Sequence, residues 1–144
     1  MLQSMVDTLR DPLPDFPGYS LRRAANATSA ELSARLGTLD LRQVDASAMM
    51  LIESNPGVTG SALARQLDIQ RANMVPLLKR LEDAGLIDRA PIDGKSQGLE
   101  LTTTGRERVT AARHTIETFE HELLARVPEE HRAHLLPALN ALWQ

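Results

Sequence analysis

The sequence predicts a mainly α-helical fold with a small β wing, a winged helix-turn-helix flanked by helices at both ends. Between Val58 and Leu81, a short helical pattern, a tight turn and a longer helical pattern follow one another. Two short apolar runs then enclose a polar loop with Asp93-Gly94, a dipeptide that favours a hairpin turn. Apolar residues before and after this stretch recur at helical spacing. This order of elements suits a protein that places one helix in the major groove of DNA.

The composition limits the class of protein. The chain has 144 residues, 42% hydrophobic and 24% charged, as expected for a small globular domain with appended helices. No apolar run reaches the length of a membrane-spanning helix and the N-terminus lacks a secretory signal, so we expect a cytoplasmic protein with no membrane partner. The chain has no cysteine, which excludes disulfides, cysteine-ligated zinc and thiol redox sensing.

The charge balance of the chain is unusual for a protein that binds nucleic acid. The net charge is −3, which by itself argues against such a partner. Residues 59–108 hold eight Lys or Arg and seven Asp or Glu, a balance of +1, whereas the other residues sum to −4. This contrast is weak: it permits a local basic face but does not by itself indicate one.

The N-terminal part is predicted to hold an arm and two helices. Residues 1–17 contain three prolines and three aspartates, which predicts an extended arm because proline lacks an amide donor and restricts its neighbours. Helices are predicted from Tyr19 to Leu36 and from Leu41 to Ser54. Asp40 followed by Gln43 resembles a capping box for the second helix.

The predicted helix-turn-helix has one buried and one outward face. Thr59 is placed to cap its short first helix, Gln70 to cap the longer second helix, and Gly85 to end it. The inward stripe of the second helix comprises Met74, Leu77, Leu78 and Leu81. Its outward side is expected to carry Arg71, Ala72, Asn73, Val75, Pro76, Lys79 and Arg80.

Two strands and two further helices complete the chain. The strands are predicted over residues 86–90 and 99–101. Thr102 is placed to cap a helix that runs to about Arg126, and Pro128 precedes a last helix. Both helices carry apolar stripes, which comprise Val109, Ala112, Ile116, Phe119 and Leu123, then Leu135, Leu136, Leu139 and Leu142. These stripes need burial, either against a second copy of the chain or against their own domain.

Several segments, taken in order, resemble the winged-helix core of the MarR family of bacterial transcriptional regulators over residues 38–108. They are Asn55-Pro56-Gly57-Val58-Thr59, Leu63-Ala64-Arg65-Gln66-Leu67, Leu81-Glu82-Asp83-Ala84-Gly85-Leu86-Ile87, Asp93-Gly94-Lys95-Ser96 and Leu99-Glu100-Leu101-Thr102-Thr103-Thr104-Gly105. The resemblance extends over residues 19–142 and implies a homodimer on a palindrome of double-stranded DNA. It implies a dimerisation helix within 1–37, a DNA-binding domain at 38–104 and dimerisation helices at 105–144. In such a dimer the two reading helices lie roughly 34–36 Å apart.

The candidate DNA contacts follow from side-chain chemistry. Arg71 and Asn73 suit base contacts, because Arg pairs with guanine and Asn with adenine. Val75 and Pro76 can face a thymine methyl group, although Pro76 can equally be a tolerated kink. Basic and polar residues suited to the DNA backbone are Gln70, Lys79, Arg80, Arg89, Lys95 and Ser96. Any of these side chains can also belong to a merely solvated face.

The loop of the predicted hairpin departs from the family pattern. Family members commonly carry Asp-x-Arg-Ser there, and this chain has Lys95 in place of the arginine. Lysine keeps the charge but loses the planar fork, so we expect contact with phosphate rather than readout of a narrow groove.

A ligand site is suggested by the segment from Phe16 to Asn26. It combines scarce aromatic residues with two adjacent arginines at a helix start, where a bound anion would relieve their repulsion. The arginines can equally pair with acids of a partner chain. The resemblance implies a repressor released by a small aromatic acid. In the subgroup that controls hydroxycinnamate or other aromatic-acid catabolism, it implies an aryl-CoA thioester effector. The candidate effector residues are Tyr19, Arg22, Arg23, Asn26 and Met49.

Other functions are less well supported. The sequence has no nucleophile elbow, phosphate-binding glycine loop or dinucleotide motif, so neither an enzyme nor a cofactor is expected. His114, Glu117 and His121 have helical spacing that could chelate a metal weakly, but solvated or dimer-interface histidines are favoured and no metal site is expected. The alternative function is a winged-helix module that binds a protein rather than DNA, which would explain the acidic balance.

Overall fold

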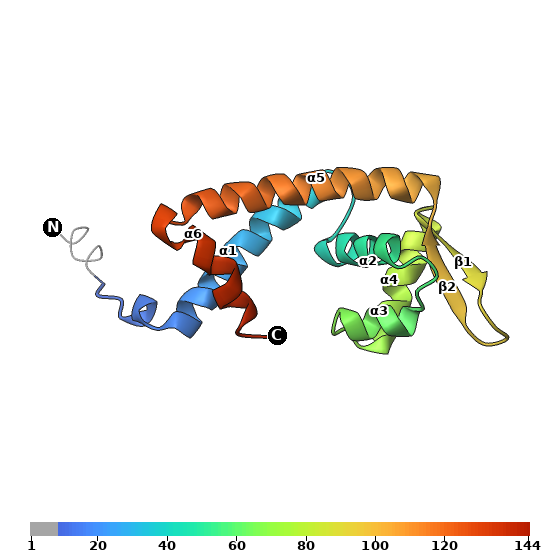
Figure 1. Cartoon of the computed structure of the whole chain (residues 1–144), viewed down its shortest axis with the longest axis horizontal. Helices are drawn as coiled ribbons and strands as arrows, with labels where there is room; N and C mark the ends of the chain where they lie inside the picture. Colours follow the sequence, from blue (N-terminus) through green and yellow to red (C-terminus); the bar gives the residue numbers. More distant parts are fainter. Residues whose placement is uncertain (1–8) are drawn as a thin grey trace. The chain divides into compact units, whose positions relative to one another are not determined.

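The structure, a computed structural model, describes residues 9–144 as helices with one β-hairpin (Figure 1). A 3-10 turn, Leu13–Asp15, precedes the first helix, so part of the expected extended arm is a turn, and residues 1–8 of that arm lie outside the described residues. The elements that follow are α1 Pro17–Gly37, α2 Gln43–Ser54, α3 Gly60–Gln66, α4 Arg71–Asp83, β1 Ile87–Pro91, β2 Gln97–Leu101, α5 Thr103–Arg126 and α6 Glu129–Asn140. The predicted fold class, mainly α with a small β wing, is confirmed.

The chain divides into two compact units, and the boundary between them falls within α1. The first ends at Glu31 and the second begins at Leu32, so the second unit contains every element from α2 to α6. The three-part division predicted from the sequence, with boundaries after residues 37 and 104, stays a prediction.

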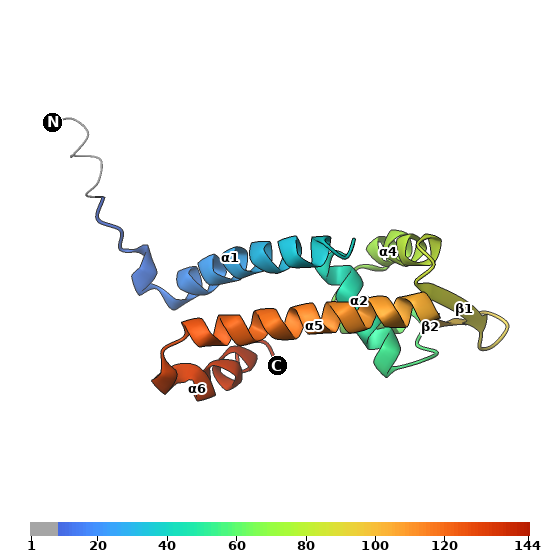
Figure 2. The same cartoon turned by 90° about the horizontal axis from the view of Figure 1, so that it is seen from above.

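The core of the second unit lies where α2, α3, α4 and the hairpin meet the first half of α5. Helix α2 lies alongside α5 in both views of the ribbon (Figures 1 and 2). The predicted inward stripe of α4 is confirmed, since each of its four side chains is at most 4% exposed. They pack with buried residues of the other elements, including Met49, Ile52, Leu63, Leu86, Leu99 and Val109.

The hairpin is fixed against the start of α3. Strands β1 and β2 are antiparallel and pair Ile87 with Leu101 and Pro91 with Gln97. The backbone N–H of Gly57 donates to Leu99 O at 2.9 Å, and Leu99 N–H donates to Val58 O at 2.8 Å. A Cβ at Gly98 would lie 2.8 Å from Gly57 O, so only glycine permits this close approach. The hairpin and α3 therefore hold a fixed distance.

Two predicted N-terminal helix caps are confirmed and two are wrong. Thr59 Oγ1 accepts from Ala62 N–H at 3.2 Å, and Thr102 Oγ1 accepts from Gly105 N–H at 2.9 Å. The expected capping box of Asp40 and Gln43 does not form, because α2 begins only at Gln43 and Asp40 adopts a φ of 55° in the turn after α1. The N-terminus of α2 is capped instead by Asp45, described below. Gln70 occupies the N-cap of α4, but its side chain makes no cap hydrogen bond.

The last helix carries leucines that stay unburied in the single chain. It follows Pro128 as predicted, and none of its residues, all of which the structure describes, is buried in the single chain. Leu136 is 65% exposed, and beyond the helix Trp143 is 75% exposed. No helix in the described part of the chain combines the length and the apolar composition that a membrane span requires.

Candidate nucleic-acid interface

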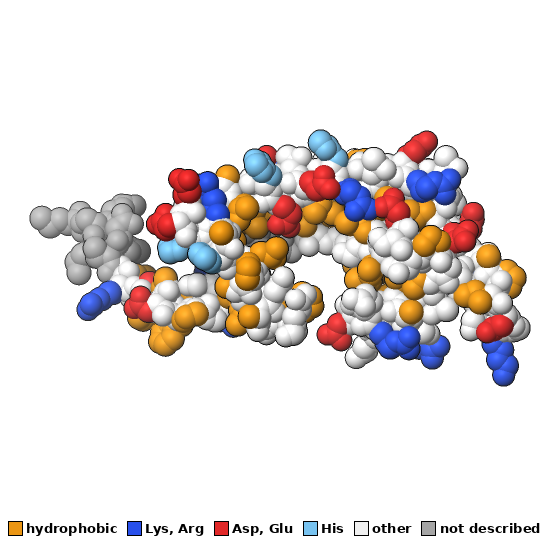
Figure 3. Space-filling view, viewed as in Figure 1, with side chains coloured by type: hydrophobic (Ala, Val, Ile, Leu, Met, Phe, Trp, Pro, Cys, Tyr) orange, Lys and Arg blue, Asp and Glu red, His pale blue; other side chains and the backbone are white. Residues whose placement is uncertain are grey.

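A groove of about 460 Å³ lies between α4 and the hairpin, with the start of α3 at one end. Its lining contains Thr59, Gly60, Ser61, Arg71, Met74, Val75, Leu78, Arg89, Pro91, Asp93, Gly94, Lys95, Ser96 and Gln97. Figure 3 shows Lys and Arg side chains gathered below α3 and at the tip of the hairpin. The groove therefore brings together five of the predicted DNA contacts from two elements: Arg71, Val75, Arg89, Lys95 and Ser96.

Arg71 is held in place at the groove by a side-chain hydrogen bond. It is the first residue of α4, and its Nη2 donates to Ser61 Oγ of α3 at 2.9 Å. A second hollow, of about 450 Å³, lies between α3 and the start of α4 and is also lined by Arg71 and Ser61. The guanidinium group is thus held at the junction of two surface hollows, where it still has donors to offer to a ligand.

The tip of the hairpin is a turn held by one carboxylate. Asp93 Oδ1 accepts from Lys95 N–H at 2.9 Å and from Ser96 N–H at 2.8 Å. These two backbone hydrogen bonds hold the pKa of the Asp93 carboxyl below its ordinary value. Ile92 N–H also donates to Ser96 O at 3.0 Å. The exposed Lys95 is therefore carried on an ordered turn, as a phosphate contact requires.

The outward face of α4 is accessible. Val75 is 64% exposed and lines the groove, whereas Gln70, Asn73 and Pro76 are exposed but lie outside its lining. An exposed aliphatic side chain beside an arginine is a suitable pair for a thymine methyl group next to a guanine.

Three residues that were predicted to contact the DNA backbone form ion pairs within the chain. Lys79 Nζ lies 3.1 Å from Asp83 Oδ2, and Arg89 Nε lies 2.8 Å from Glu82 Oε2. Exposed pairs of this kind contribute little stability, so the cations can exchange their partners for phosphate. Arg80 differs from the expectation of an outward side chain, because its guanidinium group bonds to a buried carboxylate of α2.

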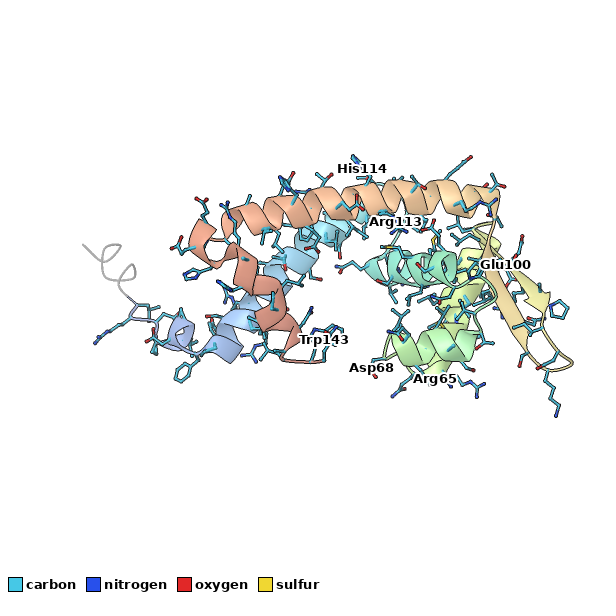
Figure 4. All side chains as sticks on the ribbon, in the orientation of Figure 1. Arg65, Asp68, Glu100, Arg113, His114 and Trp143 are labelled. Atoms are coloured by element: carbon cyan, nitrogen blue, oxygen red, sulfur yellow. The ribbon has the colours of Figure 1, made fainter. Side chains whose placement is uncertain are left out.

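Sequence reasoning missed two polar residues of α3 at this surface. Ser61 lines both hollows, and Arg65 is exposed and lines the second one. In Figure 4, Arg65 of α3 and Asp68 of the turn after α3 point outward at the edge of the unit. The available signal was the spacing of Ser61, Arg65 and Asp68, which places them on one side of a short helix that Thr59 caps.

The effector candidates fall into both units. In the first unit, the Arg22 and Arg23 guanidinium groups lie 5.8 and 5.9 Å from the centroid of the Tyr19 ring, and Arg23 Nη1 donates to Tyr19 Oη at 3.3 Å. Asn26 is exposed on the same helix. Met49 of the second unit is fully buried in the core, where the apolar faces of α2 meet α4 and α5, and it has no surface to offer a ligand.

The histidines of α5 do not form a metal centre. Within residues 9–144 no group of three or more His, Asp or Glu side chains is placed to share a metal ion. Figure 4 shows His114 pointing away from α2, while the neighbouring Arg113 points toward it. Arg113 forms an ion pair with Glu53 of α2.

Residues 41–94 match the MarR family. The HTH-type transcriptional repressor Mb2911 of Mycobacterium bovis is 31% identical over 96 residues, which cover 67% of this chain and 69% of that protein. The chain belongs to the MarR family. It is a MarR transcriptional regulator with a winged-helix fold, and the relatives it matches are regulators rather than enzymes.

Solved structures of other proteins resemble most of the chain. The transcriptional repressor CouR bound to a 23-mer DNA duplex is 29% identical, with a TM-score of 0.88 over 96% of this chain and all of that one. CouR bound to p-coumaroyl-CoA is 28% identical, with a TM-score of 0.82 over 94% and 97% of the two chains. Rv2887 of Mycobacterium tuberculosis in complex with salicylic acid is 26% identical, with a TM-score of 0.70 over 95% and 98%.

Proposed function

We propose that the protein is a ligand-responsive repressor that binds a palindromic operator in double-stranded DNA as a homodimer. The observation that carries this proposal is the groove between α4 and the hairpin, which gathers Arg71, Arg89 and Lys95 around an exposed helix face. The similarity to CouR, which is known in complex with a DNA duplex, supports the same reading. A basic groove beside an accessible helix provides both backbone contacts and base contacts.

In this proposal α4 enters the major groove. Arg71 reads a guanine, Asn73 reads an adenine and Val75 contacts a thymine methyl group. The hairpin follows the DNA backbone with Lys95 at its tip. The remaining phosphate contacts come from Gln70, Lys79, Arg89 and Ser96, together with Ser61 and Arg65 of α3.

The decisive experiment is the substitution of Arg71. A palindromic operator is first selected from a library of random duplexes, and binding is then measured on this operator and on a random duplex. Arg71→Ala is expected to weaken operator binding by about 1–3 kcal/mol and random binding far less, because a bidentate base contact is lost. Arg71→Lys is the matched control: it keeps the charge, so random binding is retained while operator preference falls. Equal losses of Arg71→Ala on both duplexes would show that Arg71 reads no base.

The homodimer is supported by the apolar surface of the C-terminal segment. Leu136, Leu142 and Trp143 are 65%, 68% and 75% exposed in the single chain. Contiguous exposure of large apolar side chains marks an interaction surface in a monomer. A second copy of the chain supplies the partner that a palindrome requires.

The effector in this proposal is a small aromatic acid or its aryl-CoA thioester. CouR with p-coumaroyl-CoA and Rv2887 with salicylic acid support this ligand class. Tyr19, Arg22, Arg23 and Asn26 contact the ligand, with the arginines binding its carboxylate or phosphates. A thermal-shift screen of aromatic acids and their CoA thioesters, followed by isothermal titration and release of operator DNA, tests this assignment. If no member of either class binds, this effector class is wrong.

A winged helix that docks on a protein is the competing function, and salt distinguishes the two. Binding that neutralises several phosphates weakens steeply as salt rises, with a slope of about −0.9 per phosphate in a plot of log K against log salt. We expect such a slope for this protein on a DNA duplex. A flat dependence on salt would favour protein docking.

A further inference from the structure

Asp45 is the one charged residue that is buried in the described part of the chain. It lies in the first turn of α2 and is 3% exposed. Its Oδ2 accepts from Arg42 N–H at 2.9 Å and so caps the start of α2. Its Oδ1 accepts from Arg80 Nη2 of α4, which joins residues 35 positions apart in the chain. One carboxylate therefore links the start of α2 to the recognition helix.

Arg80 is committed to this contact. Its side chain is 38% exposed, and its Nε is buried without a hydrogen-bond partner. A buried carboxylate is strongly disfavoured unless a charged partner compensates it. If the guanidinium group turned outward to a phosphate, Asp45 would be left buried without a charged partner. Arg80 therefore faces into the protein although it belongs to the helix that faces DNA.

The apolar contacts of α4 bury its inward side, and the ion pair adds a directional contact to them. Met74, Leu77, Leu78 and Leu81 hold the helix against the core, but hydrophobic burial is non-directional. A charge-assisted hydrogen bond has a defined direction and can fix one orientation of a packed helix. Arg71 and Val75 lie on the same helix, so the orientation that Arg80 sets determines where these two side chains meet the bases.

We propose that Asp45 and Arg80 form an internal clamp that sets the rotation of the recognition helix on α2. Arg80 is then a positioning residue for DNA reading and makes no phosphate contact. This inference rests on the proposed DNA-binding function and assigns one residue pair within it. It replaces the expectation from the sequence that Arg80 binds the DNA backbone.

The test compares Arg80→Met and Asp45→Asn with the wild-type protein on the selected operator and on a random duplex over a range of salt. The clamp predicts that each variant lowers the ratio of operator to random affinity about tenfold, while the salt slope of Arg80→Met stays at the wild-type value. Lys95→Ala is the matched control, since loss of one phosphate contact reduces the slope by about 1. The double variant should be no worse than either single variant, because both remove one interaction.

Three results would overturn the clamp. A salt slope reduced by about 1 in Arg80→Met would make Arg80 a phosphate contact. An unchanged affinity ratio with only a lower melting temperature would make the pair merely structural. Additive losses in the double variant would show that the residues act separately.

Arg80→Lys keeps the test informative if Arg80→Met does not fold. It leaves a cation near Asp45 but removes the directional fork, so it should fold and still lower the affinity ratio with an unchanged slope. A wild-type ratio in Arg80→Lys would count against the clamp. Failure of the wild-type protein to select any operator would overturn the proposed function itself, a result distinct from all the others.

Discussion

Helices α4 and α6 are similar in sequence character but differ in what covers them. They have 13 and 12 residues, each has a leucine-rich side, and each contains an internal proline, Pro76 or Pro137. Four side chains of α4 are buried in the core of the single chain. In α6, which the structure describes in full, no side chain is buried, and Leu136 is 65% exposed.

The difference shows two ways in which an apolar stripe can be buried, either against the same chain or against a partner chain. Helix α4 packs on α3 and β1 and is joined to α2 by the Asp45–Arg80 ion pair, so its burial requires one chain and places the reading surface within that chain. Helix α6 contacts α5 alone among its larger contacts in the described residues and keeps an apolar surface that a partner can cover. The stability of the winged-helix region should therefore depend on the single protomer, whereas the burial of α6 should depend on the dimer.

The largest effect is expected for Leu81→Ala in α4. Leu81 is 2% exposed, so truncation leaves a cavity in the core and should lower the free energy of unfolding by about 2–5 kcal/mol. Urea denaturation at a protein concentration low enough to dissociate the dimer measures this loss. Leu136→Ala is the matched control, since the same truncation at an exposed position should cost much less in the dissociated protomer. Equal losses at the two positions would remove the distinction between the helices.

The second effect is the loss of the dimer in Leu136→Glu. A charge placed in an apolar interface should weaken dimerisation by about 2 kcal/mol or more. Sedimentation analysis over a range of protein concentrations measures the dissociation constant. Operator binding should fall with the dimer, while binding of one protomer to a half-site persists. His134→Glu adds the same charge at another exposed position of α6 and should have a smaller effect. A dimer unaffected by Leu136→Glu would place the interface elsewhere.

The contrast between α4 and α6 also shows what the sequence could predict. The buried stripe of α4 and the caps at Thr59 and Thr102 depend on residues a few positions apart, and all were predicted. The contact of Arg71 with Ser61 depends on how α3 and α4 pack, and no local spacing predicts it. The exposure of α6 could not be predicted either, because a stripe of leucines does not indicate which surface covers it.

The errors at α2 have a related cause. Three acids or amides near its start could each act as a cap, and the choice depends on where α1 ends. Asp40 is used in the turn after α1, so the cap falls to Asp45. Met49 was assigned to a ligand because α2 is apolar on more than one face, a pattern that cannot separate core from pocket. The sequence thus located the elements and much of the reading face but not the contacts between helices.

A third, smaller effect is expected at the joint between the hairpin and α5. Thr102 Oγ1 accepts from Gly105 N–H and also donates to Gly85 O at 2.6 Å, so it caps α5 and ties it to the end of α4. Thr102→Ala should lower the free energy of unfolding by about 1 kcal/mol, as for other lost N-caps. Thr104→Ala, at the exposed second residue of the same helix, is the control. Both variants should be compared by denaturation at several concentrations, because a joint within the protomer predicts a loss independent of dimerisation.

The smallest effect is expected at the tip of the hairpin. Its turn depends on hydrogen bonds within the tip and not on the core or a dimer partner. Backbone N–H groups of Lys95 and Ser96 bind the Asp93 carboxylate and lower its pKa. A carboxyl whose pKa is lower in the folded state stabilises the turn fully above its unfolded pKa, and this contribution is lost as the pH falls through the folded value. Acid should therefore loosen the turn at the tip, but only at a pH below the ordinary titration range of aspartate.

Amide hydrogen exchange and chemical shifts of Lys95 and Ser96 follow the tip directly during a pH titration by NMR. In the wild-type protein we expect protection at neutral pH and its loss only below the ordinary titration range of aspartate. Asp93→Asn keeps an oxygen acceptor without the charge, so its weaker protection should not change over this pH range. Asp93→Ala should show little protection at any pH. An Asp93 that titrates at its ordinary value, with both amides unaffected, would mean that the turn is held by its backbone alone and that Lys95 is positioned without the carboxylate.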